Sequence, residues 1–329
     1  MLSTTVIQFP GLALTLDPPS SIELFGLSIH YYGVIIAFGM LLAVAYCWKR
    51  ARQFGVKEDD LTDGILWIVP VAILCARMYY VAFKWEDYAD DPITMLYIWN
   101  GGLAIYGGII GAVICAVIHC KIKKIKFAAV MDLVVLGLLI GQLVGRWGNF
   151  MNREAYGAEI TGDFFLRMGL MKTAEGALSS TMHYFHPTFL YESAWNFVGL
   201  ILLHFLSKRR KYDGQIALGY MAWYGLGRAM IEGLRTDSLW WGPFRVSQLV
   251  AAVTCFVAVV ALAILSFRWH DPEKLYVNQV AALKAQEEAE EKTEDGEETV
   301  EVETADDADA PVDAPAEVPA ETPEETPEE

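Results

Sequence analysis

The sequence has few cysteines, and none lies in a pattern typical of redox or metal chemistry. All five (Cys47, Cys75, Cys115, Cys120 and Cys255) fall in or at the ends of apolar runs. There is no C-x-x-C pair, and no Cys/His spacing of the kind that holds a metal ion. We therefore expect five small buried apolar side chains, no metal site and no cofactor.

Basic residues are scarce at both ends of the chain. Residues 1–21 contain no Lys or Arg, so we do not expect a cleaved signal peptide. Residues 287–329 hold twenty acidic residues and one Lys, whereas residues 1–286 carry 24 Lys and Arg against 21 Asp and Glu. The net charge of −16 therefore belongs to an acidic tail on a near-neutral body, and no nucleic-acid partner is expected.

Long hydrophobic runs are abundant. Hydrophobic residues make up 54% of the chain, which is too apolar for a soluble domain of this length. Seven runs approach or exceed the ~20 residues that span a bilayer. They are roughly 24–47, 64–83, 97–119, 128–146, 188–206, 215–232 and 246–267. The sequence predicts an all-α integral membrane protein with about seven transmembrane helices.

The connections between these runs differ in charge. The first, third and fifth are basic, with Lys49, Arg50, Arg52 and Lys57, then Lys121, Lys123, Lys124 and Lys126, then Lys208, Arg209, Arg210 and Lys211. The second is mainly acidic. Because basic connections stay in the cytoplasm, the N-terminus is expected outside and the C-terminus inside.

This orientation predicts the domain organisation. A membrane catalytic domain covers residues 1–270, and residues 151–186 form a small extracytoplasmic head. A short cytoplasmic segment (271–286) and an acidic tail (287–329) follow. The tail is rich in Glu, Pro, Ala and Thr without aromatic residues, so it is expected to be disordered.

The polar stretch Gly145–Gly157 (GRWGNFMNREAYG) follows the fourth run and is expected at the outer face. Glycine lets a backbone approach a ligand closely, and the arginine fork fits phosphate oxygens. Two readings remain open: a phosphate-binding turn, or an interfacial helix end with snorkelling side chains.

Further polar blocks lie inside or beside the runs. Tyr32 opens the first run, where aromatic residues are often belt residues. Arg77 lies in the second run, facing either a polar interior or a buried Glu. Two Gly-Gly pairs precede and follow Tyr106, and they indicate either a broken helix entry or close helix packing.

The fifth and sixth runs carry charged residues as well. The block His186-Pro187-Thr188-Phe189-Leu190-Tyr191-Glu192 begins the fifth run, where His186 is a ligand, a base or a cap. Tyr224, Arg228 and Glu232 share one helix face at i, i+4 and i+8. Arg228 and Glu232 either line a site or only form an ion pair with each other.

Taken together, four blocks resemble the prolipoprotein diacylglyceryl transferases over roughly residues 20–270. They are the stretch Gly145–Gly157, the Tyr-Gly at Tyr32, the H-P-T-x-L-Y-E block from His186, and the Y-x-x-x-R-x-x-x-E face from Tyr224. The resemblance implies a multi-pass enzyme of the bacterial cell membrane, with its active site towards the outer face. It also implies transfer of the diacylglyceryl group of phosphatidylglycerol to the lipobox cysteine of a prolipoprotein, which releases glycerol phosphate.

The resemblance also implies site residues. The expected catalytic residues are Arg146, Arg228 and Tyr106. The expected phosphatidylglycerol-binding residues are Arg146, Asn149, Glu154, Gly157, Tyr32, Arg77, Tyr224, Glu232, His186 and Glu192. Tyr106 stands where many members of the family have a histidine that is assigned as the general base, and a tyrosine hydroxyl is a weak base at neutral pH.

Three other classes are weaker fits to the sequence. A transporter would also place Arg and Glu in broken helices, but the two halves show no repeat. A lipid-binding scaffold would not need several separated polar blocks. An intramembrane protease would need a partner for Asp132, and no second Asp lies inside a run.

Overall fold

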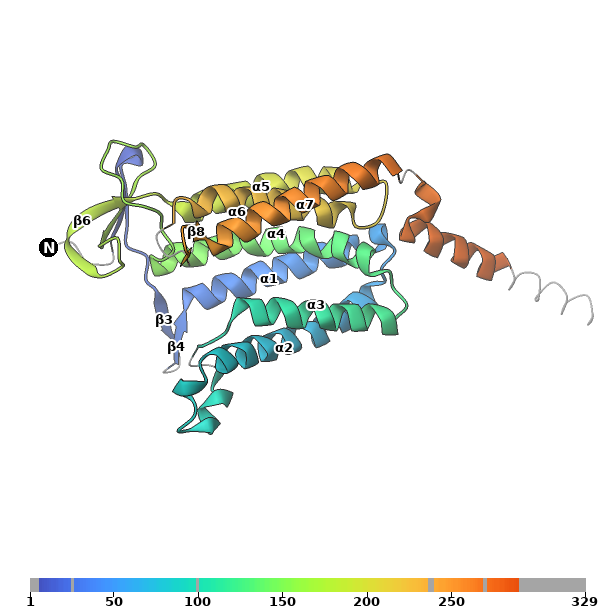
Figure 1. The fold of residues 1–329 in the computed structure, drawn as a ribbon, viewed down its shortest axis with the longest axis horizontal. Helices are drawn as coiled ribbons and strands as arrows, with labels where there is room; N and C mark the ends of the chain where they lie inside the picture. The colour runs from blue at the N-terminus through green and yellow to red at the C-terminus, as the bar shows by residue number, and fades with distance from the viewer. Residues whose placement is uncertain (1–5, 25–26, 99–100, 236–239, 269–270, 290–329) are drawn as a thin grey trace, which may run out of the picture. The chain divides into compact units, whose positions relative to one another are not determined.

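The computed structural model describes the chain except for residues 1–5, 25–26, 99–100, 236–239, 269–270 and 290–329 (Figure 1). The chain divides into two compact units, Met1–Val280 and Ala281–Glu329. In the segment predicted at 271–286, a 3-10 helix forms at Pro272–Lys274. Residues 276–289 are helical, so the first three residues of the predicted disordered tail belong to a helix. From residue 290 onward, the predicted disordered tail lies outside the described residues.

The first unit is built mainly of long helices (Figure 1). They are α1 (Tyr31–Arg50), α2 (Glu58–Phe83), α3 (Ile105–Ile122), α4 (Phe127–Asn152), α5 (Thr188–Ser207), α6 (Gln215–Glu232) and α7 (Val246–Arg268). In the described part of the chain, six helices are long and apolar enough to cross a membrane, and α6 is outside this set. A mostly helical membrane protein is therefore confirmed, whereas the seventh span and the orientation remain predictions.

Two predicted runs begin earlier than the helices that they contain. The first was expected from residue 24, but Ser21–Leu24 (β3) and Leu27–His30 (β4) form an antiparallel hairpin before α1. The third was expected from residue 97, but α3 begins at Ile105. Gly101 and Gly102 have φ values of +85° and +72°, a left-handed backbone that cannot continue a helix.

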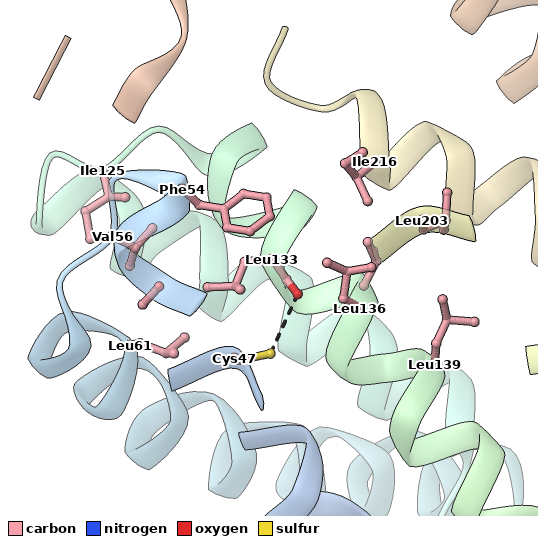
Figure 2. Close-up of a cluster of buried hydrophobic side chains, with 12 residues drawn as sticks. Cys47, Phe54, Val56, Leu61, Ile125, Leu133, Leu136, Leu139, Leu203 and Ile216 are labelled. Atoms are coloured by element: carbon pink, nitrogen blue, oxygen red, sulfur yellow. Dashed lines mark hydrogen bonds between the residues drawn. The ribbon is translucent and has the colours of Figure 1, made fainter. Parts of the chain in front are cut away.

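The helices associate mainly in pairs: α1 with α4, α2 with α3, and α6 with α7, while α5 packs against α4 and α6. Figure 2 shows a buried apolar cluster built from several of these helices. Its members include Phe54, Leu133, Leu136 and Ile216, which are fully buried. Cys47 belongs to the same cluster, and its thiol donates to the Leu133 carbonyl at 3.6 Å (Figure 2).

The described residues also contain a small antiparallel sheet, which the all-α prediction missed. The strand order is β2-β1-β5-β6, with β1 at Ile7–Phe9, β2 at Leu14–Leu16, β5 at Met168–Lys172 and β6 at Leu178–Phe185. A second hairpin, β7 (Trp240–Trp241) and β8 (Phe244–Arg245), precedes α7. Strands β1, β2, β7 and β8, of two or three residues each, are too short to show a period-2 pattern in sequence.

The sheet shares one apolar core with the nearby helix ends. Phe150 of α4 and Phe189 of α5 pack at 4.8 Å between ring centroids, and both belong to a buried cluster with Ile7, Leu170 and Phe185 of the sheet. Residues 151–186 are therefore a folded part of the first unit rather than a spacer.

Asp132 fixes the start of α6. Its fully buried carboxylate accepts hydrogen bonds from the backbone N–H groups of Gly214, Ile216 and Ala217 at 2.8–2.9 Å. These groups have no partner within the first turn of a helix, and the negative charge also matches the helix dipole. Asp132 therefore caps a helix, which gives it a structural role.

We predict that Asp132→Ala lowers the free energy of unfolding by about 3 kcal/mol, because three buried N–H groups lose an ionic acceptor. Thermal unfolding of the purified protein in detergent measures the change. Asp90→Ala, at an exposed loop position, is the matched control. Equal melting temperatures for the two variants would contradict the capping role.

Candidate active site

The site is centred on Glu192, a carboxylate in the second turn of α5 that is only 5% exposed. Three guanidinium groups surround it. Arg146 Nη2 lies 2.6 Å from Oε2, and Arg235 Nη1 and Arg228 Nη1 lie 3.2 and 3.6 Å from Oε1. One buried carboxylate thus holds three arginines that are distant in sequence.

A second carboxylate extends this network. Arg228 Nη2 lies 2.7 Å from Glu232 Oε2, one turn further along α6, and Glu232 is 2% exposed. The two residues do pair, as one of the sequence readings expected, but Arg228 also reaches Glu192. The Glu232 carbonyl accepts a hydrogen bond from Arg245 at the end of β8.

A cavity of about 440 Å³ opens beside this network. Its polar lining includes Arg228, Glu232, Arg235 and Ser247. Its other walls are Tyr79 of α2, Tyr106 of α3, and Val246 and Val250 of α7. The cavity thus combines fixed positive charge with aromatic and aliphatic surface.

Only some of the site residues predicted from the sequence line this cavity. Tyr106, Arg228 and Glu232 line the cavity. Arg146 is not among the described residues that line it, and it joins the site through Glu192. Tyr224, on the same helix as Arg228, stacks on Tyr220 with ring centroids 5.5 Å apart.

The stretch Gly145–Gly157 is the end of α4 and the turn that follows it. Arg153 and Ala155 have φ values of +52° and +53°, so the chain reverses sharply after the helix. Within this turn, the side-chain amide of Asn149 donates to Glu154 Oε1 at 3.0 Å, and that of Asn152 donates at 3.4 Å. The three side chains therefore cross-link the turn.

Two glycines of the stretch sit where a side chain would clash. A Cβ on Gly148 would lie 2.8 Å from the ring of Tyr32, which places Tyr32 directly against α4. A Cβ on Gly157 would lie 2.8 Å from His186 Cβ and 3.0 Å from the Leu234 carbonyl. Glycine thus brings the turn against the start of α5 and the end of α6.

Arg77 is buried, but its partners differ from those of the other site arginines. Its Nε donates to Met95 O at 2.8 Å, and its Nη2 donates to Thr94 O at 2.9 Å. Its Nη1 donates to the carbonyls of Gly101 and Gly102 at 2.9 and 3.1 Å. Arg77 therefore clamps the segment before α3, and its contact with phosphatidylglycerol remains a prediction.

The two Gly-Gly pairs around Tyr106 behave differently. Gly101 and Gly102 form the non-helical approach to α3, as the broken-entry reading expected. Gly107 lies within α3, where a Cβ would come within 2.4 Å of Tyr79 Cβ on α2. The second Gly-Gly pair therefore allows close packing of α3 against α2, which was the other interpretation of these glycines.

His186 lies just before α5. Its Nδ1 is 3.3 Å from the Tyr191 hydroxyl, and its ring lies 5.7 Å from that of Phe164. Burial lowers the pKa of His186 below its ordinary value of 6.5, which favours the neutral imidazole at neutral pH. His186 is not among the described residues that line the cavity.

Arg235, Tyr79 and Ser247 line the cavity but were absent from the predicted site residues. The one signal for Arg235 was its place seven residues after Arg228 in the sequence, although α6 ends at Glu232 and Arg235 lies beyond the helix. Tyr79 and Ser247 carried no comparable signal. Within the described residues, no group of three or more His, Cys, Asp or Glu side chains is arranged to hold a metal ion.

Comparison with known proteins gives one consistent family. The family model for prolipoprotein diacylglyceryl transferase matches residues 19–264. The phosphatidylglycerol–prolipoprotein diacylglyceryl transferase of Bacillus cytotoxicus is 39% identical over 264 residues, covering 80% of this chain and 95% of the relative. The protein of the same name from Listeria monocytogenes is 41% identical over 250 residues, covering 76% and 89%. That of Lysinibacillus sphaericus is 41% identical over 247 residues, covering 74% and 90%.

We predict that Glu192→Gln lowers the free energy of unfolding by about 3–5 kcal/mol, because three guanidinium groups lose their shared buried counter-charge. Thermal unfolding in detergent measures the loss. Glu58→Gln, which removes a partly exposed ion pair with Arg52, should change stability by less than about 1 kcal/mol. Similar losses for both variants would contradict the central role of Glu192.

Proposed function

Because the chain belongs to the prolipoprotein diacylglyceryl transferase family, we propose that it transfers the diacylglyceryl group of phosphatidylglycerol to a prolipoprotein. The acceptor is the thiol of the lipobox cysteine near the end of the signal peptide. The products are a thioether-linked lipoprotein precursor and glycerol phosphate. This is the first step of bacterial lipoprotein maturation.

The observation that carries this proposal is the arginine network beside an apolar-walled cavity. Arg228 and Arg235 provide planar donors for phosphate oxygens, and both are held by buried carboxylates. Tyr79, Val246 and Val250 provide apolar surface for the part of the lipid that adjoins the head group. An anionic phospholipid combines these two requirements in one molecule.

The proposed reaction is a displacement at carbon. The cysteine thiol loses its proton, which passes to a phosphate oxygen and leaves with the glycerol phosphate. The thiolate sulfur attacks the carbon of the diacylglyceryl unit that is bonded to the phosphate oxygen. A C–S bond forms, the C–O bond breaks, and the electron pair leaves with glycerol phosphate. Guanidinium groups fixed in advance stabilise the negative charge that develops on the departing phosphate.

We assign Arg146 and Arg228 to this phosphate, with Asn149, Glu154 and Gly157 shaping the turn beside it. Tyr106 lines the cavity with Arg228 and is half exposed, so its hydroxyl is available to an incoming thiol. We assign it as the partner of the thiol, polarised by the neighbouring guanidinium. Tyr32, Arg77, Tyr224, His186, Glu192 and Glu232 complete the proposed lipid-binding set, and no cofactor takes part.

We further propose that α6 is a seventh membrane span, with the N-terminus outside and the C-terminus in the cytoplasm. The basic connections after α1, α3 and α5 support this orientation. The arginine network then faces the outer side of the bacterial cell membrane, where the folded sheet forms the extracytoplasmic head. A lipobox cysteine reaches the same side once its signal peptide has inserted.

The reaction itself is tested with purified protein in detergent, phosphatidylglycerol and a lipobox peptide, followed by mass spectrometry of the cysteine. We expect a diacylglyceryl thioether with the wild-type chain and none with Arg146→Ala. The Arg146→Lys variant should turn over roughly 100-fold more slowly, because lysine keeps the positive charge but cannot form the bidentate hydrogen bonds of a guanidinium group.

Arg167→Lys is the matched control, since Arg167 pairs with Asp163 outside the site. Turnover by Arg146→Lys at the wild-type rate would contradict the phosphate role of Arg146. If folded wild-type protein forms no adduct with a proven peptide, the transfer proposal fails, and a flux assay for the transporter alternative becomes the next test.

The role of Tyr106 has its own test. Tyr106→Phe should lower the turnover number at least about 10-fold, because the hydroxyl is removed while the ring is kept. Tyr106→His should retain substantial turnover and make it dependent on pH between about 5 and 8, since imidazole titrates in that range. Both are measured as pH–rate profiles in the same peptide assay. A Tyr106→Phe variant with the wild-type profile would exclude Tyr106 as the thiol partner.

A further inference from the structure

Arg153 lies inside the polar stretch Gly145–Gly157, but the proposed reaction gives it no role. It follows α4 directly, and its side chain is only 7% exposed. Its guanidinium donates from Nη1 to the Met151 carbonyl at 2.8 Å and from Nη2 to the Pro18 carbonyl at 2.6 Å. Nη2 also lies 3.5 Å from Asp17 Oδ1. Arg153 thus ties the turn after α4 to the segment between β2 and β3.

The four-stranded sheet holds the backbone of the same residue. Lys172, at the end of β5, donates from Nζ to the Arg153 carbonyl at 2.9 Å. Burial lowers the pKa of Lys172, the positive charge of Arg153 lowers it further, and the negative charge of Glu154 opposes both effects. The ammonium group of Lys172 therefore lies among the charges of this turn, where it tethers the turn to the sheet.

The two tethers act on a backbone that is unfavourable without them. Arg153 and Ala155 have the left-handed φ values of +52° and +53°, which cost free energy for a residue with a Cβ. Glu154 lies between these two residues, so their conformation determines the direction of its side chain. That side chain accepts the amide hydrogen bonds of Asn149 and Asn152. The arrangement of all three polar side chains therefore depends on the conformation at Arg153.

We propose that Arg153 and Lys172 are positioning residues for the turn after α4. Together they hold the conformation that places Asn149 and Glu154 beside the reacting lipid. This inference rests on the proposed function and deepens it, because it makes the sheet a scaffold of the site. When either tether is lost, the left-handed residues relax, the turn samples other conformations, and the chemical step slows.

The transfer assay with phosphatidylglycerol and a lipobox peptide tests each tether. Lys172→Met keeps an unbranched side chain and removes the donor, whereas Arg153→Gly removes the guanidinium but suits a left-handed backbone. We expect each variant to lower kcat roughly 10-fold and to change KM for the lipid less than about 2-fold, because the turn is needed chiefly in the transition state. Lys172→Arg keeps a donor and should retain kcat within about 3-fold of the wild type.

A double variant separates positioning from general destabilisation. Both tethers restrain the same backbone, so Arg153→Gly combined with Lys172→Met should lower kcat roughly 10- to 20-fold, whereas independent effects would multiply to roughly 100-fold. Melting temperatures identify variants that have lost their fold. Arg153→Lys or Lys172→Gln, each a smaller change, then replaces the unfolded variant and should lower kcat in the same direction.

Lys124→Gly is the matched control for the change to glycine. Lys124 also has a left-handed backbone, with φ of +55°, but it is exposed in the turn between α3 and α4. This variant should keep the wild-type kcat and KM. A loss of kcat as large as that of Arg153→Gly would assign the effect to glycine itself and overturn the tether at Arg153.

The outcomes distinguish this inference from the proposed function. If the wild type transfers the diacylglyceryl group but the folded single variants keep its kcat or change KM alone, the positioning role is excluded and the transferase proposal stands. Multiplying effects in the double variant likewise exclude a shared role of Arg153 and Lys172. If the folded wild type forms no adduct, the proposed function fails, and the positioning role fails with it.

Discussion

The carboxylate of Glu192 is the interaction on which the arrangement of the site depends. Three guanidinium groups from α4, α6 and the segment after α6 converge within 3.6 Å of it. Guanidinium ions at this spacing repel one another strongly in a medium of low polarity. The buried carboxylate of Glu192 on α5, with that of Glu232 on α6, offsets this repulsion. Because Glu192 contacts all three arginines, it couples the packing of three elements to the chemistry of the cavity.

Arginine serves at least three purposes in this chain, and the partner determines which one. Arg77 meets backbone carbonyls and shapes a loop. Arg50 and Arg210 lie over the ring of Phe54, at 5.5 and 4.3 Å, and join α1 to the α5–α6 connection. Arg228 and Arg235 meet carboxylates beside a cavity. A buried arginine therefore indicates a substrate site only when fixed carboxylates and an open volume accompany it.

Sequence patterns predicted the helices well and named some of the residues that the structure brings together around Glu192, for identifiable reasons. The predicted starts of α5, directly after Pro187, and of α6, directly after Gly214, agree with the structure. Pro and Gly often mark the ends of helices, which makes such boundaries visible in the sequence. The i, i+4 spacing of Arg228 and Glu232 left an ion pair and a site-lining role open, and in the structure the two residues form the pair and also line the cavity. The carbonyl partners of Arg77 and the link from Glu192 to Arg235 depend on tertiary contacts, which no local spacing encodes. The strands β1 and β2 have three residues each, too few to show a period.

The position of β1 in its sheet has a consequence for biosynthesis. Ile7 pairs with Leu170, so the strand made first waits for a partner that is synthesised only after α1 to α4. Contacts between such distant segments form late and slowly. Through that interval β1 can pair with β2, but Ile7 and Phe9, which are buried in the final fold, lack their neighbours on β5 and β6. The four-stranded sheet can therefore close only after α1 to α4 have been synthesised.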